Sequence, residues 1–513
     1  MSVVIVIGGG HNGLTAAALL ARRGRRVLLI EQGEEVGGVA RGSAFATDFQ
    51  TLGTLHDSSC VAPELLHTLG LGNQLPRVPA EHDAVFFPEV DGPGLVLHRD
   101  PALAVAELTQ RAPKDVANYQ RWRDFIGRAR RFVGPLLEAA PPSLGRRGVG
   151  SLLELLRRGW SLRRLGARDM TELMRVIPMS AADWLTDAFD CELLRAGLVL
   201  PALHGAWFGP RSPGGAANLL FHECLAGPEL VGGPASLVQS LALTCRSLGV
   251  EIRTNSSVRR VLVERGVVAG VELDAGERVD GATVVATCDP RQLLLELLEP
   301  RALPAETESS AREWRCRGVL AKVDLALDGP LEWAGRPGAR FHAVRISETL
   351  DTAERAFDHL KYGEFSAQPV LDLRVPSVVD RTFAPAGREF VSVLVSFAPH
   401  DVAGGWTAAR REALADAVVA RIAALAPTVS SRIVARQVRT PDDFARDFRL
   451  TGGHLYHGEL ALDQVLSLRP NVGCSSGVTP IPGLFLGGSG CHPGAGISGR
   501  SGMLAAERVL SAR

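Results

Sequence analysis

The first thirty residues constrain the fold more than any other part of the chain. An apolar run, Val3 to Ile7, leads directly into Gly8-Gly9-Gly10-His11-Asn12-Gly13, and an amphipathic helical pattern follows from about Leu14 to Arg23. A second strand-like run, Arg26 to Glu31, comes next. This order predicts a strand, a glycine turn, a helix and a second strand, which together form a βαβ unit of a parallel sheet.

The glycine turn has the spacing of a phosphate-binding loop. Gly8, Gly10 and Gly13 satisfy G-x-G-x-x-G, in which the first glycine permits the turn, the second lets the backbone approach a pyrophosphate and the third allows close helix packing. The helix N-terminus then offers free N–H groups and the positive end of its dipole. Glu31 ends the second strand, where a carboxylate can accept hydrogen bonds from a ribose diol. These features predict a dinucleotide site and suit NAD as well as FAD.

Glycine-rich segments elsewhere in the chain extend this site. Gly37-Gly38 allows a second close approach of the backbone. Near the C-terminus, a buried strand around residues 483–487 feeds the turn Gly487 to Gly499 and a closing helix that runs to Leu510. This second strand-to-helix junction predicts another set of backbone donors facing an anionic or carbonyl edge. No second G-x-G-x-x-G with a following acid stands in a βαβ setting, so a separate NAD(P) domain is not expected.

Five motifs together resemble a known family. They are the run from Val4 to Gly38, His204-Gly205-Ala206-Trp207, Gly232-Gly233, the segment 453–458 and the block Gly487 to Gly496. They are similar to the phytoene-dehydrogenase-like branch of the FAD-dependent amine-oxidase superfamily, and most of all to the pyridine nucleotide-disulphide oxidoreductase domain-containing protein 2 group. The likeness covers the chain from end to end, and it is specific in the first and last blocks.

The resemblance implies FAD as the cofactor and assigns its contacts. It places the pyrophosphate on the three loop glycines, the adenosine ribose on Glu31, the adenine at the backbone of Val258, and the ribityl chain and isoalloxazine under the C-terminal block. One departure is visible, because Gly488-Ser489 stands where many such flavoproteins carry Gly-Asp. The full set of expected cofactor-binding residues is Gly8, Gly10, His11, Asn12, Gly13, Glu31, Gly37, Gly38, Val258, Gly488, Ser489, Gly494, Gly496 and Ile497.

The chain is too long for one hydrophobic core, since it has 513 residues. We therefore expect an α/β protein with a doubly wound Rossmann-type FAD-binding domain and a substrate domain of mixed sheet plus helices. The FAD domain is predicted to comprise residues 1–75, 225–300 and 445–513, and the substrate domain residues 76–224 and 301–444. Leu, Ala and Arg at helical spacing predict a helical insertion at about 105–200.

The charge and cysteine content limits the partners and the compartment. Lys plus Arg equals Asp plus Glu at 56 each, so nothing favours a nucleic-acid partner. The eight cysteines are scattered without a CxxC pair, which predicts neither a zinc site nor a disulfide framework and fits a reducing cytoplasmic compartment. His454 and His457 are three residues apart, but no third ligand accompanies them, so no metal is expected.

The predicted function is FAD-dependent oxidation of a hydrophobic substrate. The resemblance suggests desaturation or dehydrogenation of a carotenoid- or lipid-like molecule by hydride transfer to the flavin N5 atom, with an electron acceptor that no motif identifies. His492 and His204 are the candidate acid–base groups, with weaker candidates at His454, His457, Glu459 and Asp463. Three alternatives stay open: amine oxidase-type C–N oxidation, a redox-silent carotenoid isomerase, and a flavin-binding regulatory protein without turnover.

Residues 146–168 have two interpretations. Seven arginines stand there among Leu152, Leu153, Leu156, Trp160 and Leu165, with Glu154 as the single acid. The segment is either a solvated arginine face over a helical subdomain or a basic amphipathic helix that lies on the inner membrane face. The second interpretation would suit the extraction of a lipid-like substrate. The arginines are Arg146, Arg147, Arg157, Arg158, Arg163, Arg164 and Arg168.

Overall fold

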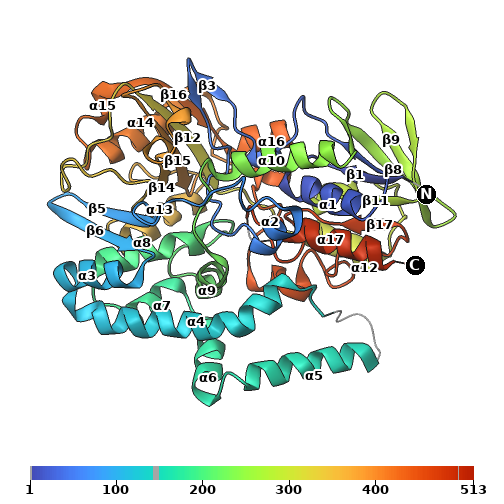
Figure 1. The fold of residues 1–513 in the computed structure, drawn as a ribbon, viewed down its shortest axis with the longest axis horizontal. Coiled ribbons are helices and arrows are strands. Elements are labelled where there is room, and N and C mark those ends of the chain that lie inside the picture. Colours follow the sequence, from blue (N-terminus) through green and yellow to red (C-terminus); the bar gives the residue numbers. More distant parts are fainter. Residues whose placement is uncertain (1–2, 143–148, 495, 513) are drawn as a thin grey trace.

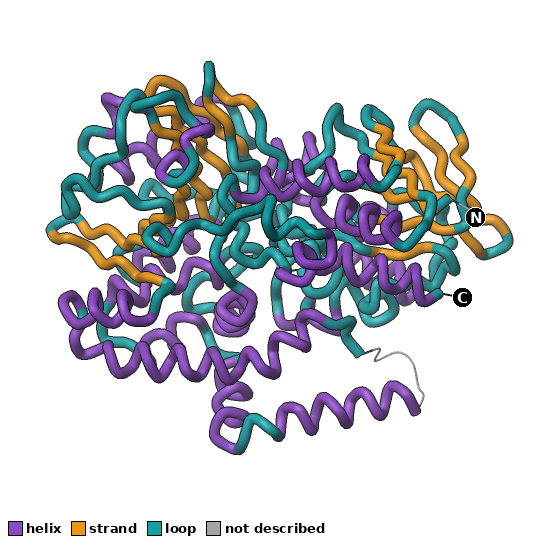
Figure 2. Tube along the Cα trace, in the orientation of Figure 1, coloured by secondary structure: helices purple, strands orange, loops and turns teal. Residues whose placement is uncertain are grey.

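Two sheets organise the molecule, one in each lobe of the computed structural model (Figure 1). The structure describes residues 3–142, 149–494 and 496–512. Both termini lie on the lobe that contains the parallel sheet, at the right of Figure 1. Figure 2 shows the helices gathered mainly below the other lobe, where they form a layer of their own.

The parallel sheet is built on strand β1 (Val4–Ile7), and its strand order is β17-β11-β1-β2-β7. Successive side chains of a strand face opposite sides. Val4 and Val6 accordingly join the core beneath helix α1, whereas Ile5 and Ile7 pack against a three-stranded antiparallel sheet on the other face. The bounds are β2 Val27–Ile30, β7 Glu251–Arg253, β11 Thr283–Ala286 and β17 Leu484–Leu486, with α1 His11–Arg22, α10 Gly233–Ser247 and α17 Arg500–Ser511 on the helical face.

The antiparallel layer consists of β8 (Val258–Glu264), β9 (Val267–Leu273) and β10 (Arg278–Asp280). Its Val258 and Val261 share a core with Ile5 and Ile7. The parallel sheet is therefore covered by helices on one side and by a small sheet on the other. This arrangement confirms the predicted α/β class with a Rossmann-type FAD-binding domain.

A seven-stranded mixed sheet, ordered β16-β12-β15-β14-β13-β5-β6, forms the second lobe. Strands β13 and β5 pair parallel and the other neighbours pair antiparallel, which confirms the predicted mixed sheet. One face packs on helix α14 (Ala408–Ala423). The strands are β5 Ala84–Glu89, β6 Gly92–His98, β12 Leu320–Leu327, β13 Ala343–Ile346, β14 Val370–Arg374, β15 Glu389–Ser396 and β16 Ile433–Arg439.

Helices fill the space below the mixed sheet and continue beyond the predicted insertion at 105–200. They are α3 Pro101–Arg111, α4 Val116–Glu138, α5 Val149–Arg163, α6 Ala167–Val176, α7 Ala181–Ala188, α8 Glu192–Leu203 and α9 Gly215–Leu225. The remaining elements are β3 Ala44–Ala46, β4 Phe49–Gln50, α2 Pro63–Leu69, α11 Pro290–Leu295, α12 Ala305–Glu313, α13 Leu350–Lys361, α15 Val429–Arg432 and α16 Pro441–Phe448. Within the described ranges, none of these helices has the length and hydropathy of a membrane span.

Candidate active site

A cleft of about 870 Å³ opens at the carboxyl ends of β1, β2 and β11. This is the edge of a parallel sheet at which α/β proteins bind their ligands. Nine of the residues predicted to contact the cofactor line the cleft: Gly8, Gly10, His11, Asn12, Gly13, Glu31, Gly38, Val258 and Ser489.

The phosphate loop combines one crowded glycine with one open glycine. A Cβ atom on Gly13 would overlap the carbonyl oxygen of Gly8, so only glycine lets helix α1 start this close to the strand. A Cβ on Gly10 would meet no protein atom within 4 Å and would point into free space. Helix α1 has no side-chain cap at its N-terminus, which leaves its first N–H groups for a ligand.

Glu31 is held by the two backbone segments that flank it. Its Oε2 atom accepts a hydrogen bond from Gly9 N over 2.6 Å, and its Oε1 atom accepts one from Gly33 N over 2.8 Å. Gly37 N also donates a hydrogen bond to the carbonyl oxygen of Gly9 over 2.8 Å, which holds residues 9 and 37 together beside Glu31. The carboxylate is therefore fixed in orientation at the edge of the cleft, as binding of a ribose diol requires.

The C-terminal block closes over the loop through side-chain contacts. Asn12 Nδ2 donates to Ser489 Oγ over 3.2 Å, and Asn12 Oδ1 accepts from Gly502 N over 3.3 Å. The buried guanidinium of Arg469 donates to the carbonyl oxygens of Tyr456 and Ser489, each over 2.9 Å. These bonds join three segments that are distant in sequence, and they give the turn after β17 a fixed position.

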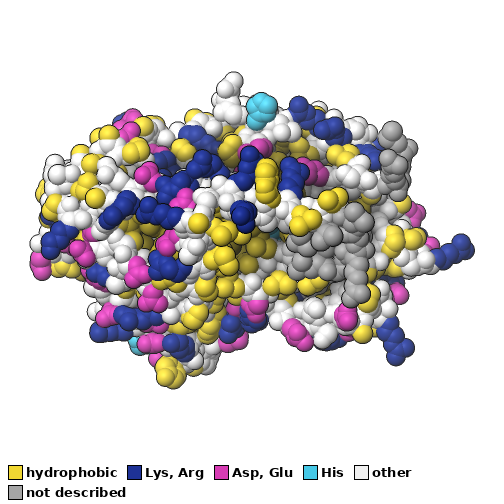
Figure 3. All heavy atoms as spheres, turned by 90° about the horizontal axis from the view of Figure 1, so that it is seen from below, with side chains coloured by type: hydrophobic (Ala, Val, Ile, Leu, Met, Phe, Trp, Pro, Cys, Tyr) yellow, Lys and Arg dark blue, Asp and Glu magenta, His cyan; other side chains and the backbone are white. Residues whose placement is uncertain are grey.

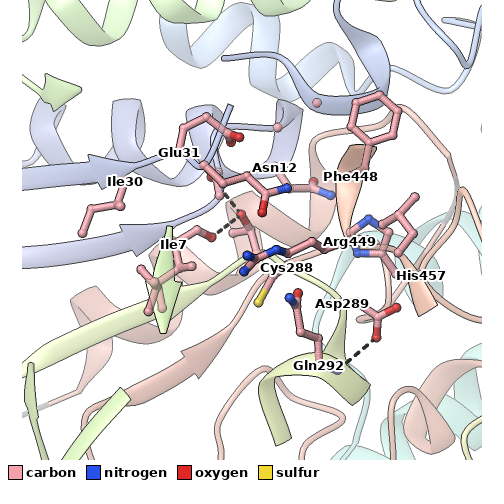
Figure 4. Close-up of a pocket in the computed structure, with 18 of the residues that line it drawn as sticks. Ile7, Asn12, Ile30, Glu31, Cys288, Asp289, Gln292, Phe448, Arg449 and His457 are labelled. Atoms are coloured by element: carbon pink, nitrogen blue, oxygen red, sulfur yellow. Dashed lines mark hydrogen bonds between the residues drawn. The ribbon is translucent and has the colours of Figure 1, made fainter. Parts of the chain in front are cut away.

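Several residues of the cleft were not expected from the sequence. Figure 4 shows Glu31 and Asn12 on one side and Asp289, Gln292 and His457 on the other. Thr287 follows β11, the direct neighbour of β1, so its position was deducible only once the strand order was known. The additional lining residues include Thr287, Cys288, Asp289, Gln292, Phe448, Arg449 and His457.

A second cavity of about 930 Å³ lies against the C-terminal turn. Gly496 and Ile497, both predicted to meet the cofactor, line this cavity together with Pro493. Most of the remaining wall is apolar, from Leu55, Leu137, Pro201, Phe221, Leu225, Leu394, Leu460, Val465 and Leu466. A polar group of side chains interrupts it: His56, Asp57, His204, Asn218, His222, Asp372 and Tyr456.

Comparison with known proteins matches this geometry. The family model for flavin-containing amine oxidoreductases matches residues 13–510. The chain belongs to this family. The fold and the cleft fit its cofactor, FAD, because open space lies beside Gly10, the start of helix α1 has no side-chain cap, and the Glu31 carboxylate is fixed at the edge of the cleft.

Relatives of this flavin oxidoreductase extend over nearly its whole length. Pyridine nucleotide-disulfide oxidoreductase domain-containing protein 2 of Mus musculus is 31% identical, over 99% of this chain and 93% of the relative. A neurosporene-forming phytoene desaturase of Cereibacter sphaeroides is 26% identical, over 96% and 92%. A structure of putrescine oxidase bound to putrescine has a TM-score of 0.61 at 16% identity, covering 99% of this chain and 98% of that one. The resemblance inferred from the motifs is thus confirmed.

In this flavin oxidoreductase the mixed sheet contributes Asp372 of strand β14 to the polar part of the cavity wall. Its inner face carries ionisable side chains at alternating positions, whereas the opposite face is aliphatic. Lys322 and Asp372 lie in register on either side of Leu394, and Asp324 and Arg374 lie on either side of Ser392. All four of these charged residues are buried. The alternation of ionisable and aliphatic residues along strands β12 and β14 is the sequence signal from which this polar face could have been found.

The cavity acids are already paired with cations. Asp372 accepts a hydrogen bond from Arg374, and Asp57 Oδ2 lies 3.6 Å from His222 Nε2. Burial acts against both charges of the second pair, but the neighbouring charges prevail: Asp57 and Glu223 raise the pKa of His222 to about 9, and His222 holds the pKa of Asp57 well below its usual value. The pair therefore stays ionised at neutral pH.

The two predicted catalytic histidines occupy different places. His204 follows helix α8 and lines the cavity, and its Nε2 atom is buried without a partner among the described residues. Burial lowers the pKa of His204 to about 4, so its imidazole is neutral at pH 7. His492 is buried in the C-terminal turn beside Pro493 and is not among the residues that line the cavity. Its role in catalysis stays a prediction.

The weaker candidates are held by local contacts. His454 Nδ1 accepts from Gly458 N over 3.2 Å, Glu459 pairs with Arg317, and Asp463 pairs with Arg315. The two ion pairs hold the segment 453–463 against residues 315–317. His457 and His11 both line the cofactor cleft, so their surroundings belong to cofactor binding.

Proposed function

We propose that this flavin oxidoreductase dehydrogenates a largely apolar substrate in the cavity of about 930 Å³. One observation carries the proposal: a mainly aliphatic cavity adjoins Pro493, Gly496 and Ile497 and contains His204, a neutral histidine whose Nε2 atom has no hydrogen-bond partner among the described residues. Such a cavity buries a hydrophobic molecule and keeps water away from the reacting bond. The relatives with phytoene desaturase activity support the same substrate class.

Dehydrogenation removes a hydride and a proton from neighbouring atoms. FAD supplies the hydride acceptor when it is bound. The chain then has to orient the substrate and receive the proton, and neutral His204 is the group of the cavity that is placed to do so. The apolar wall from Leu55, Phe221 and Ile497 orients the substrate by shape.

Amine oxidation is the second candidate and fits the cavity less well. An alkylammonium group needs an unpaired carboxylate or an aromatic cage. Among the described lining residues, both carboxylates, Asp57 and Asp372, already face a cation, and the only aromatic rings are Phe221 and Tyr456. Because the chain belongs to the flavin-containing amine oxidoreductases, amines are included among the donors to be tested.

Anaerobic reduction of the bound cofactor tests the proposal. The FAD-loaded protein is mixed with carotenoids, apolar carbonyl compounds and alkylamines, and the visible flavin absorption is followed together with the product mass. We expect an apolar donor to bleach the flavin and to yield a product that lacks two hydrogens. Bleaching by amines alone would establish C–N oxidation, and an isomerised product without bleaching would establish an isomerase. A flavin that responds to no donor would contradict turnover.

A His204→Gln variant separates the role of the base from binding. It should bind the active donor with unchanged affinity while flavin reduction slows about 100-fold or more. The matched control is His359→Gln, since His359 is exposed on helix α13. Equal rates of flavin reduction in the two variants would remove His204 from the mechanism.

A further inference from the structure

A buried array of three side chains leads from the mixed sheet to the cavity. Lys322 Nζ donates a hydrogen bond to Ser392 Oγ, and Ser392 Oγ lies 3.0 Å from His56 Nδ1. Lys322 Nζ is also 3.3 Å from His56 Nδ1. Lys322 and His56 are each 1% exposed, and His56 lines the cavity. The array therefore joins a buried cation to the space that we assign to the substrate.

The direction of these hydrogen bonds fixes the tautomer of His56. An ammonium group only donates, so Ser392 Oγ accepts from Lys322 and its own proton is free for His56 Nδ1. His56 Nδ1 then accepts hydrogen bonds from both Ser392 Oγ and Lys322 Nζ. A neutral imidazole that accepts at Nδ1 carries its proton at Nε2. Burial and the charge of Lys322 hold the pKa of His56 well below its usual value, which keeps the ring neutral.

The Nε2 atom of His56 is buried and has no hydrogen-bond partner among the described residues. A buried donor without a partner costs about 1–3 kcal/mol, so such atoms commonly mark a place where a ligand or water binds. The nearby charges have both signs. Lys322 and Arg374, which lies on the far side of Ser392 in the sheet, reinforce this donor, whereas Asp57 and Asp324, whose Oδ1 atom is 3.7 Å from Lys322 Nζ, oppose it.

We infer that the Lys322–Ser392–His56 array binds a carbonyl oxygen of the substrate through Nε2–H of His56. A positive charge behind a neutral donor favours an oxygen on which negative charge grows during the reaction. The inference rests on the proposed dehydrogenation and names its substrate class, an apolar molecule in which the oxidised carbon–carbon bond is next to the carbonyl. In this reaction the substrate would lose its α-proton to His204 and a hydride from its β-carbon to the flavin when FAD is bound, so that the carbon–carbon single bond would become a double bond and the carbonyl oxygen would be unchanged.

Ligand binding without turnover tests this inference. The probes are an unbranched α,β-unsaturated methyl ketone labelled with ¹³C at the carbonyl and the alkene of equal chain length, each titrated into the FAD-loaded protein. We expect the ketone to bind about tenfold more tightly, because one buried donor becomes satisfied. Its carbonyl ¹³C resonance should move downfield, as hydrogen bonding to the oxygen requires. Equal affinity for the two probes would overturn the inference.

Two variants locate the effect. His56→Leu should abolish the preference for the ketone and the ¹³C shift while alkene binding persists. Ser392→Ala keeps both ionisable groups and interrupts the array, so it should reduce the ¹³C shift even if His56→Leu fails to fold. His359→Gln is the control and should behave as the parent protein. A ketone preference that survives in both variants of the array would also contradict the inference.

The outcomes separate this inference from the proposed function. Ketone preference in a protein whose flavin no donor reduces would leave the oxygen site standing and remove dehydrogenation. Flavin reduction by a hydrocarbon with no ketone preference would leave dehydrogenation standing and remove the oxygen site. The binding titration therefore tests the oxygen site, and the bleaching assay tests dehydrogenation, independently of each other.

A second feature, independent of the buried array, is a hydrophobic stripe on the exposed surface of helix α5. Leu153, Leu156 and Trp160 are 59–61% exposed and lie on one face of the helix, because they are spaced three and four residues apart. Arg157 and Arg164 flank this stripe, and among the described residues neither forms an ion pair. The guanidinium carbon of Arg164 stacks 4.2 Å from the Trp160 ring centroid. Arg146 and Arg147 of the same basic segment lie outside the described residues.

The position of α5 relates this stripe to the substrate cavity. The helix runs along the lower edge of the molecule, beneath α4 (Figure 1), and Figure 3 looks onto this side, where hydrophobic and basic side chains intermingle. Leu137 near the end of α4 lines the cavity, and Ser467 donates to the carbonyl oxygen of Pro142 over 2.9 Å. The described residues that follow α4, up to Pro142, thus pass beside the cavity wall.

We propose that this face of α5 docks on an anionic phospholipid bilayer. An exposed Leu-Leu-Trp stripe between unpaired arginines has the composition of a helix that lies in the membrane interface, with lipid phosphates as the counter-charges. Docking there would place the cavity close to the lipid phase in which an apolar substrate dissolves.

Vesicle binding tests the docking proposal. The FAD-loaded protein should sediment with vesicles of phosphatidylcholine plus phosphatidylglycerol and not with phosphatidylcholine alone, and added salt should release it. Leu156→Ser with Trp160→Ser should abolish sedimentation, whereas the matched control Leu243→Ser, at an exposed leucine of α10, should not. No sedimentation with anionic vesicles, or a dimer that the double substitution dissociates, would contradict the proposal.

Discussion

The side-chain amide of Asn12 donates a hydrogen bond to the hydroxyl of Ser489 over 3.2 Å, across 477 positions of sequence. Asn12 belongs to the phosphate loop and Ser489 to the turn after the last strand, so this bond connects the two ends of the cofactor cleft. We expect Asn12→Ala and Ser489→Ala to be non-additive in FAD affinity. A double-mutant cycle should give a coupling of about 0.5–1.5 kcal/mol. A coupling near zero would mean that each residue meets the cofactor independently.

Alanine substitutions at Gly10 and at Gly13 should differ in their effects on protein stability and on FAD binding. A Cβ at Gly13 overlaps the carbonyl of Gly8, so Gly13→Ala should lower the free energy of unfolding of the apoprotein by about 1–3 kcal/mol. A Cβ at Gly10 meets no protein atom, and Gly10 has φ −69°, which alanine adopts freely. Gly10→Ala should therefore keep apoprotein stability and weaken FAD binding about tenfold or more by obstructing the phosphates.

Denaturation and FAD titration of the two variants check this difference. If Gly10→Ala destabilises the apoprotein as much as Gly13→Ala does, the free space beside Gly10 is not a phosphate site. Unchanged FAD affinity in Gly10→Ala would lead to the same conclusion.

The position of the Glu31 carboxylate predicts a charge-dependent contact with the ribose. Glu31→Gln keeps the shape of the side chain and removes the charge that strengthens its hydrogen bonds. Since a hydrogen bond to a charged group contributes about 1.5–3 kcal/mol, the dissociation constant of FAD should rise about 10- to 100-fold. Glu34→Gln, an exposed neighbour in the following loop, is the control and should leave it unchanged. Equal affinities of the two variants would contradict the assignment.

The cofactor cleft was predictable because its signals are local. The glycine spacing, the strand-end position of Glu31 and the turn 487–499 each lie within one short segment, and strand–turn–helix geometry follows from such a segment directly. Thr287 and Arg449 were missed because they reach the phosphate loop only through the order of the strands and the position of helix α16. The residues next to Thr287 and Arg449 in the sequence do not predict either feature.

The polar wall of the substrate cavity was not predictable for a similar reason. Each of the strands β12, β14 and β15 shows its polar positions in the sequence. The array of Lys322, Ser392 and His56 exists only because β15 lies beside β12 and because His56, 266 residues before Lys322, packs against both strands. The sequence predicted only that the substrate is hydrophobic. The structure adds that the apolar cavity has a polar end with ionisable side chains.

The ion pair between His222 and Asp57 predicts a pH-dependent stability at alkaline pH. The pKa of His222 in the folded chain is raised from 6.5 to about 9, so its stabilising contribution is complete below pH 6.5 and disappears as pH rises through 9. Other buried groups titrate in the same range: burial raises the pKa of Glu229 to about 7 and lowers that of Lys322 to about 8. A comparison with a variant is therefore required.

His222→Gln removes the titrating group and leaves Glu229 and Lys322 in place. Denaturant unfolding at pH 6.5 and pH 9 should show the parent protein more stable than the variant at pH 6.5, with a smaller difference at pH 9. The difference isolates His222, because the contributions of the other two groups are common to both proteins. A difference that stays constant between the two pH values would show that His222 is neutral in the folded chain, and Asp57 would then need another partner in the cavity.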